Sequence, residues 1–320
     1  MMNRMKITVV GAGAMGSLFG GLLAERGHEV TLVDVNAAHL QAIQSQGLRL
    51  HTDQGDRHIH ALRACRPDEA DGVPDLVLVF TKTLHTASAL TGVAHLIGPE
   101  THVLSLQNGL GNVEVIGQHA ALGRILIGVT TWPADLVGPG HVHSHGQGVV
   151  RLMSADGRDR PFVAPVAQAL DEAGLACTAD AAVWTAIWEK VAFNAALNSI
   201  CTATQCTVDQ LGAIDDGTAL AFCVVDEVLA VAQAQGVTVH ADACKARVAD
   251  AIGRHVGHKP SMLQDVLAGR RTEIESINGA VVAAAAAHDI PVPCTRTLLQ
   301  IVRLVQARQA GTALAGSAVQ

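Results

Sequence analysis

The stretch Lys6-Ile-Thr-Val-Val-Gly-Ala-Gly-Ala-Met-Gly16 joins a β-branched run to a glycine-rich turn, and an apolar-periodic segment, residues 18–26, follows it. This order predicts a strand, a tight turn and a helix. In a dinucleotide-binding turn the first glycine permits the bend, the second lets backbone amides approach a pyrophosphate, and the third allows close helix packing. We therefore predict a cofactor site made by Gly11, Ala12, Gly13, Ala14, Met15 and Gly16.

The next predicted strand, residues 28–34, ends in an acidic residue, Asp34, at about the spacing of a ribose contact. Its carboxylate would accept hydrogen bonds from the ribose hydroxyls and repel a 2′-phosphate, and the following residue is Val35 rather than an arginine. NADH is therefore favoured over NADPH, unless Arg49 or Arg63 folds back toward the site. The alternative is a glycine-rich turn with Asp34 facing solvent.

Three further apolar runs, residues 75–80, 102–106 and 124–130, are separated by helical stretches. This pattern predicts an α/β fold with a Rossmann-type doubly wound parallel sheet. Ligands bind such sheets beyond the carboxyl ends of the strands. We therefore expect the loops Thr81-Lys82 and 107–111, with Lys82 and Asn108, to face the cofactor.

From about residue 180 strand signals fade, and five or six helices are expected. We divide the chain into a dinucleotide-binding domain, residues 1–180, and an all-helical substrate domain, residues 181–320. On a helix from Trp184 to about Ala203, Lys190, Asn194 and Asn198 share one face, either to bind a ligand or to form hydrogen bonds between helices.

A helix start is predicted at Pro260-Ser261, and another helix is predicted near Thr272. The second start places Glu273 in a first helical turn. A carboxylate there is an ordinary partner of the helix dipole.

Composition narrows the class of protein. The chain has 320 residues, 49% of them hydrophobic, and its net charge of −7 comes without basic clusters, so nucleic-acid binding is not expected. No long uncharged apolar window predicts a membrane span, and residues 1–6 show no secretory signal. The seven cysteines lack CxxC spacing and are expected as reduced thiols. We expect a cytoplasmic protein with a small-molecule substrate.

Six pieces in order resemble the ketopantoate reductase (2-dehydropantoate 2-reductase) family: residues 11–16, Thr81-Lys82, residues 107–111, Trp188-Glu-Lys190 with Asn194 and Asn198, residues 261–265, and residues 272–279. The resemblance implies reduction of a 2-keto acid to a (R)-2-hydroxy acid, ketopantoate to pantoate, in pantothenate biosynthesis, and it makes a homodimer a weak expectation. It implies that Lys190 is the general acid and that Glu273 binds the substrate hydroxyl or organises the lysine. It places Asn194, Asn198 and Ser261 at the substrate and Lys82 near the nicotinamide, and it places Asn108 in contact with both substrate and cofactor.

The sequence departs from this family at two places. Asp34-Val35 stands where many members carry an arginine for NADPH, the family norm, and His258-Lys-Pro-Ser261 stands where members often have an asparagine three residues before the serine. An NAD-dependent D-2-hydroxyacid dehydrogenase of the same fold is therefore one alternative. A dinucleotide-sensing protein without catalysis is a second.

The alternating histidines His141, His143 and His145 would put three imidazoles on one strand face. A histidine-containing strand occurs at this place in the family, where no metal is implied. We expect no metal site in this chain.

Overall fold

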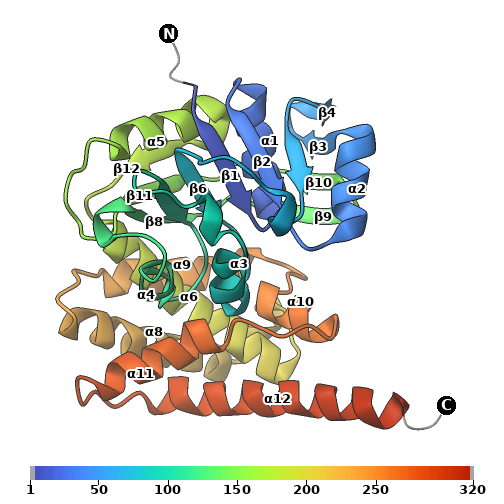
Figure 1. Cartoon of the computed structure of the whole chain (residues 1–320). Coiled ribbons are helices and arrows are strands. Elements are labelled where there is room, and N and C mark those ends of the chain that lie inside the picture. Colours follow the sequence, from blue (N-terminus) through green and yellow to red (C-terminus); the bar gives the residue numbers. More distant parts are fainter. Residues whose placement is uncertain (1–3, 318–320) are drawn as a thin grey trace. The chain divides into compact units, whose positions relative to one another are not determined.

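The computed structural model describes residues 4–317, which divide into two compact units (Figure 1). The first unit comprises the described residues up to Gln107 and Asn112–Val183. The second comprises Asn108–Gly111 and the described residues from Trp184. The loop that carries Asn108 therefore belongs to the helical unit, although it follows a strand of the first. The prediction made for residues 1–6 falls partly on residues 1–3, which lie outside the described residues.

The first unit contains an eight-stranded sheet. Its order is β12 (Cys177–Ala179), β11 (Val150–Ser154), β8 (Ile125–Thr130), β7 (His102–Ser105), β6 (Leu76–Val79), β1 (Lys6–Val10), β2 (Glu29–Val33) and β5 (Arg63–Cys65). All neighbours pair in parallel except β11 and β8. The order reverses between β1 and β6, as in a doubly wound sheet, which confirms the predicted Rossmann-type fold.

Helices pack against this sheet. They are α1 (Ala14–Glu25), α2 (Ala37–Gln46), α3 (Thr86–Gly92), α4 (Asn112–Ile116) and α5 (Val163–Leu170), which continues into a π-helical turn, Asp171–Leu175. Short 3-10 turns occur at Pro67–Glu69, Thr83–His85, Ala94–Leu96 and Leu122–Arg124. α1 contacts β1 and β2, α4 contacts β8, and α5 contacts β11 and β12 (Figure 1).

A second, four-stranded sheet in the same unit was not predicted. Its order is β4 (Gly55–Ile59), β3 (Leu48–Thr52), β10 (His141–Ser144) and β9 (Asp135–Gly138), and only β3 and β10 pair in parallel. Leu48, Leu50 and Val142 are fully buried, whereas the residues that alternate with them are polar. Because these strands bury one face only, on the side of α1, they lack the continuous apolar runs by which the central strands were identified.

The second unit is helical. It contains α6 (Val183–Thr204), α7 (Val208–Leu211), α8 (Asp215–Ala234), α9 (Ala241–Arg254), α10 (Ser261–Leu267), a π-helix (Glu275–Gly279), α11 (Ala280–Ala286) and α12 (Pro293–Ser317). The described residues thus form seven α-helices where five or six were expected, since α7 is a single turn and the π-helix leads directly into α11.

Two carboxylates, one buried and one half-buried, join these helices. Glu189 of α6 accepts hydrogen bonds from Arg247 at 2.6 Å and from the His240 side chain at 3.0 Å, which ties α6 to α9. Glu227 of α8 accepts hydrogen bonds from the backbone of Cys294 and Thr295, both at 2.8 Å, and so caps the first turn of α12.

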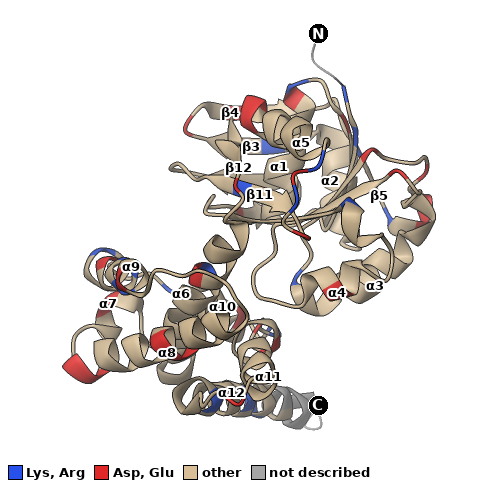
Figure 2. Ribbon diagram, turned by 90° about the vertical axis from the view of Figure 1, so that its left-hand side faces the viewer, with Lys and Arg blue, Asp and Glu red and all other residues tan. Residues whose placement is uncertain are grey.

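Among the described helices, α8 is long and apolar enough to cross a membrane by length and composition alone, with a mean hydropathy of 1.5. Its buried side chains, Val224, Val225 and Val228 among them, face other helices of the unit, and the helix also carries carboxylates (Figure 2). These features are those of a core helix of a folded unit.

Candidate active site

A pocket of about 450 Å³ in the first unit lies at the switch point of the sheet. It is bounded by residues that follow β1, β2 and β6, namely Gly11 and Gly13, Asp34 and Val35, and Thr81 and Lys82, together with Val10, Val33, Pro67, Phe80, His85, Ser88, Ala89 and Gly92. Four of the residues predicted to bind the cofactor, Gly11, Gly13, Asp34 and Lys82, therefore line one pocket. Phe80, His85 and Ser88 were not predicted to line the site, because no motif or spacing singles them out.

The three glycines of the turn differ in why a side chain is excluded at each position. Gly11 has a φ of +93°, and a Cβ there would lie 2.6 Å from the backbone nitrogen of Thr81. A Cβ on Gly16 would lie 2.0 Å from the Gly11 carbonyl oxygen, so α1 can pack against β1 only without one. A Cβ on Gly13 would meet no atom within 4 Å. The fold does not need a glycine at position 13, whereas close approach of a phosphate to the backbone does.

The N-terminus of α1 is shaped for an anion. Gly13 is its N-cap and offers no side chain to the free N–H groups of the first turn, to which Ala14, Met15 and Gly16 belong. Ser17 donates a hydrogen bond to the Ala12 carbonyl oxygen at 2.7 Å and contacts the buried His39 Nε2 at 3.1 Å.

His39 in turn accepts a hydrogen bond from the Gly140 backbone at 2.9 Å. Burial lowers the pKa of His39, which keeps the imidazole neutral in this role, although Asp34 opposes the shift. Sequence reasoning missed Ser17 and His39, because their partners lie far apart along the chain.

Asp34 is held in place by its own turn. Its Oδ1 accepts hydrogen bonds from the backbone of Val35 and Asn36 at 2.8 and 2.9 Å, which leaves Oδ2 for a ribose hydroxyl. The two arginines that were alternatives for binding a 2′-phosphate are occupied elsewhere. Arg49 bonds Asp56, with Nε and Oδ1 2.9 Å apart, and Arg63 is paired with Asp71. Neither arginine lines the pocket.

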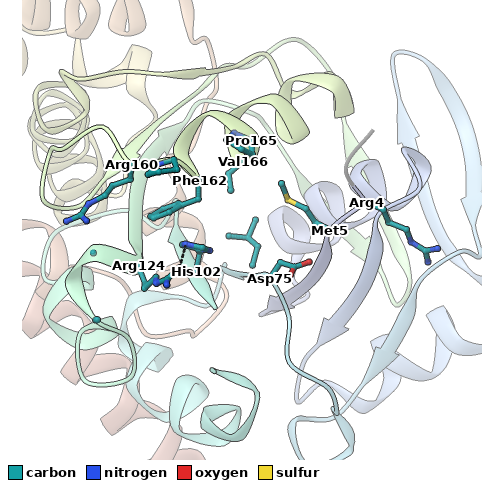
Figure 3. Close-up of a pocket in the computed structure, with 13 residues that line it drawn as sticks. Arg4, Met5, Asp75, His102, Arg124, Arg160, Phe162, Pro165 and Val166 are labelled. Atoms are coloured by element: carbon teal, nitrogen blue, oxygen red, sulfur yellow. Dashed lines mark hydrogen bonds between the residues drawn. The ribbon is translucent and has the colours of Figure 1, made fainter. Parts of the chain in front are cut away.

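A larger cavity in the same unit, about 800 Å³, opens at the amino ends of the strands (Figure 3). Arg124 on its wall contacts His102 Nε2 at 3.0 Å, and Arg160 is paired with Asp156. Doubly wound sheets bind ligands at the opposite edge, beyond the carboxyl ends. We therefore assign the smaller pocket, with its glycine turn and Asp34, to the cofactor.

In the second unit, Lys190 and Glu273 are electrostatic neighbours. Burial lowers the pKa of Lys190 to about 8, and the charge of Glu273 acts in the opposite direction. Asn108 Nδ2 lies 3.5 Å from Glu273 Oε2. The loop that carries Asn108 is fixed by a hydrogen bond from the Leu110 backbone to the Ser276 carbonyl oxygen at 2.8 Å. The structure thus brings together Lys190, Glu273 and Asn108, which are far apart in the sequence.

The polar face of α6 is buried. Asn194 and Asn198 are 9% and 6% exposed, and neither side-chain amide forms a hydrogen bond within residues 4–317. The row continues at the same spacing with Thr202, whose buried Oγ1 has no partner in the described part of the chain. The alternative interpretation, a row of hydrogen bonds between helices, is not seen for these side chains. Such a bond comes instead from Asn278, which donates to the Ala195 carbonyl oxygen at 3.5 Å.

Two predictions about the C-terminal segments have different outcomes. Ser261 is the first residue of α10, as predicted, and is exposed. Glu273 does not lie in a first helical turn: regular structure begins at Glu275, as a π-helix, and the Glu273 carbonyl oxygen accepts hydrogen bonds from the Ser276 and Ile277 backbone. Its side chain is half-buried and hydrogen-bonded to Asn108, so a helix-dipole role alone does not explain it.

The fold and these two groups of residues define an oxidoreductase of the Rossmann type with a helical second unit. The family model of ketopantoate reductase PanE/ApbA matches residues 7–157, and the model of its C-terminal part matches residues 182–306. The chain belongs to the ketopantoate reductase family.

Individual relatives agree over almost the whole chain. A 2-dehydropantoate 2-reductase of Streptococcus pyogenes is 36% identical over 95% of this chain and 98% of its own length. A structure of D-mandelate dehydrogenase with NADH and anilino(oxo)acetate is 31% identical, covers 96% of this chain and 100% of its own, and has a TM-score of 0.89. A 2-dehydropantoate 2-reductase structure from Geobacter metallireducens is 31% identical, covers 93% of this chain and 99% of its own, and has a TM-score of 0.88.

Proposed function

We propose that this chain is an NAD(P)H-dependent reductase that converts a 2-keto acid into a (R)-2-hydroxy acid, with ketopantoate as the substrate. The observation that carries the proposal is Lys190, a half-buried lysine whose pKa desolvation lowers to about 8, beside Glu273 in a chain related to 2-dehydropantoate 2-reductases. An ammonium group with that pKa is largely protonated at neutral pH and can release its proton within a catalytic cycle.

A reduced nicotinamide, when bound, would supply the hydride for the carbonyl carbon of the substrate. Lys190 donates a proton to the carbonyl oxygen and stabilises the negative charge that develops there. Glu273, hydrogen-bonded to Asn108, accepts a hydrogen bond from the substrate hydroxyl or orients the lysine. Asn194, Asn198 and Ser261 are assigned to the substrate, because the two buried amides on α6 have donors to offer a carboxylate. Lys82 and Asn108 are assigned to the nicotinamide end of the cofactor.

The proposed cofactor is NADH. Gly11, Gly13 and the first turn of α1 receive the pyrophosphate, and Asp34 accepts hydrogen bonds from the adenosine ribose. A 2′-phosphate would meet the Asp34 carboxylate, while Arg49 and Arg63 are already paired with Asp56 and Asp71. NADPH, the cofactor most family members use, would therefore bind more weakly here.

A second candidate is an NAD-dependent D-2-hydroxyacid dehydrogenase acting on branched or aromatic 2-keto acids. Two observations favour it: the related D-mandelate dehydrogenase was solved with NADH, and Asp34-Val35 here favours NADH. The chemistry at Lys190 would be unchanged, and the two candidates differ only in the side chain of the substrate.

The deciding experiment is a steady-state assay that follows loss of reduced nicotinamide, with NADH and NADPH separately, on ketopantoate and on a panel of branched and aromatic 2-keto acids. Ketopantoate should be preferred by at least about tenfold in kcat/KM, equivalent to about 1.4 kcal/mol. Preference for an aromatic acid would establish the second candidate. Binding of NADH without turnover of any acid would leave the dinucleotide-sensing alternative and refute the proposed reaction.

The remaining assignments complete the proposal. We keep the division into a dinucleotide-binding domain, residues 1–180, and a substrate domain, residues 181–320. A cytoplasmic location and a homodimer also remain predictions, which fractionation of cells and light scattering on the purified protein would check.

A further inference from the structure

The outer face of the four-stranded sheet carries a cluster of histidines. His141 and His143 are two residues apart on β10 and therefore point to the same side of the sheet. His51 of the neighbouring strand β3 is the register partner of His143. All three are half-buried, and the strands β3 and β10 lie side by side (Figure 1).

The three rings converge. One ligand nitrogen from each of His51, His141 and His143 lies within 4.8 Å of the others, and His51 Nδ1 is 3.0 Å from His143 Nε2. Nitrogen ligands bound at 2.0–2.1 Å in a tetrahedral site lie about 3.3 Å from one another, so the rings would have to approach by up to about 1.5 Å to hold an ion. His141 Nε2 is buried and has no hydrogen-bond partner within the described residues.

We propose that His51, His141 and His143 bind one divalent transition-metal ion, Zn²⁺ in the first instance. Three neutral imidazoles from adjacent strands form a ligand set that suits this ion, and a water molecule would occupy the fourth position. The bound ion would link β3 to β10, which lie about ninety residues apart in the sequence.

The surroundings limit the charge near this site. Asp56, the register partner of His51, is bonded to Arg49, so this pair adds no net charge beside the cluster. Asp135 is the register partner of His143 on the other side and is exposed. No ion pair is seen for Asp135 within the described residues, so its carboxylate can contribute a negative charge on that side of the cluster.

His145 has a different role from the three ligands. Its ring stacks edge-on against His143 and His51, but its Nδ1 lies 3.0 Å from Asp53 Oδ1. Asp53 also accepts a hydrogen bond from the Gly146 backbone, so this pair closes the end of the strand. His145 is therefore excluded from the ligand set and serves as a close control.

A second group, Cys223, Glu227 and Cys294, also brings three donors within range. There, however, both oxygens of Glu227 already accept hydrogen bonds from the first turn of α12, including one from Thr295 Oγ1 at 2.7 Å. Metal binding would have to break that cap. In the histidine cluster, metal binding would replace one hydrogen bond, between His51 Nδ1 and His143 Nε2, while His141 Nε2 has no partner to lose within the described residues.

This proposal reverses our expectation that the chain has no metal site. In the sequence, the alternating histidines from His141 to His145 lie in one segment, and no sequence spacing links them to His51. The register of a sheet that we had not predicted supplies the third ligand.

The test is a metal titration of the tag-free full-length protein, in which a chromogenic chelator competes for Zn²⁺ and the visible absorption of Co²⁺ reports coordination. We expect one ion per chain and a four-coordinate Co²⁺ spectrum. His51→Ala and His143→Ala should each weaken Zn²⁺ binding by more than about 100-fold, since loss of a group outside the ligand set already costs 10–100-fold. His288→Ala, an exposed position in the second unit, should bind as the wild type does.

Three results would overturn the assignment: no Zn²⁺ binding by the wild type, undiminished binding by His51→Ala or His143→Ala, or a loss in His145→Ala as large as in those two. The variants should keep the wild-type unfolding midpoint without metal, because the three side chains lie on the outer face of the sheet. If one does not, His51→Gln and His143→Gln replace it, with the same expected loss of binding.

Discussion

The proposed role of Lys190 makes a quantitative prediction about pH. Because its pKa is lowered to about 8, about nine-tenths of the enzyme carries the acidic proton at pH 7, and that fraction falls about tenfold for each pH unit well above 8. The value of kcat/KM should therefore be level near neutral pH and decline with a break near pH 8. A lysine with the ordinary pKa of 10.5 would give no break in this range.

Three variants separate the causes of this break. Lys190→Ala should lower kcat by about 10²–10⁴-fold, the usual contribution of a positioned general acid, with the affinity for NADH nearly unchanged. Lys190→Arg should be slow and have no break, since a guanidinium does not lose its proton in this range. Glu273→Gln should move the break to lower pH, because the charge of Glu273 raises the pKa of Lys190.

The assay is initial-rate kinetics from about pH 6 to about pH 10, two units on either side of the expected break, with cofactor affinity measured separately by fluorescence titration. Lys6→Ala, an exposed lysine at the start of β1, is the matched control and should leave the profile unchanged. Full turnover in Lys190→Ala, or a break that persists in Lys190→Arg, would show that another group supplies the proton.

Three further predictions concern cofactor binding and stability. Asp34→Ser combined with Val35→Arg should shift the NADH to NADPH preference by at least about tenfold toward NADPH, measured as the ratio of kcat/KM values, and an unchanged ratio would contradict the ribose contact. Gly13→Ala should leave the thermal unfolding midpoint unchanged, because the added Cβ meets no atom within 4 Å. The same variant should bind NADH about tenfold more weakly, or worse, in a fluorescence titration, because the methyl group keeps the pyrophosphate from the backbone. An affinity equal to that of the wild type would place the pyrophosphate elsewhere. Glu227→Ala should lower the free energy of unfolding in urea by about 2 kcal/mol, because the first-turn N–H groups of α12 lose their acceptor. Asp226→Ala removes one exposed ion pair and should lower it by less than about 1 kcal/mol. Equal losses in the two variants would refute the capping role.

The central strands could be predicted because they are buried on both faces. β1, β6 and β7 read as apolar runs in the sequence, and the structure places them within a residue or two of the predicted bounds. The four-stranded sheet could not be predicted in this way, because Leu48 and Leu50 alternate with Arg49 and His51 over one short strand. Its pairing of β3 with β10 depends on a register between segments separated by most of the first unit.

In the candidate site too, features set by neighbouring residues could be predicted, whereas contacts between residues far apart in the sequence could not. The positions of Lys190, Asn194 and Asn198 on one face follow from helical periodicity, and the glycines of the dinucleotide turn follow from their spacing. The contact of Asn108 with Glu273 does not, because it depends on a loop after β7 that packs on a π-helix far along the chain. The family resemblance placed Asn108 near the nicotinamide and Glu273 near the substrate or the lysine, and the contact between them appears only in the structure.

Because Asn194 and Asn198 of α6 are buried, they point to a binding site more strongly than exposed polar residues do. An asparagine amide that is less than a tenth exposed and lacks a partner destabilises the folded chain by about 1–3 kcal/mol. Asn194 and Asn198 are less than a tenth exposed but keep side-chain atoms within reach of solvent, so each carries at most part of this penalty, next to a lysine whose charge is itself disfavoured by burial. A sequence selected for stability alone would replace them with alanine or leucine, which favour the helix and fill the same space. We propose that a ligand that accepts their hydrogen bonds offsets this cost, so that the residues that are unfavourable for α6 alone mark the place where the keto acid would bind.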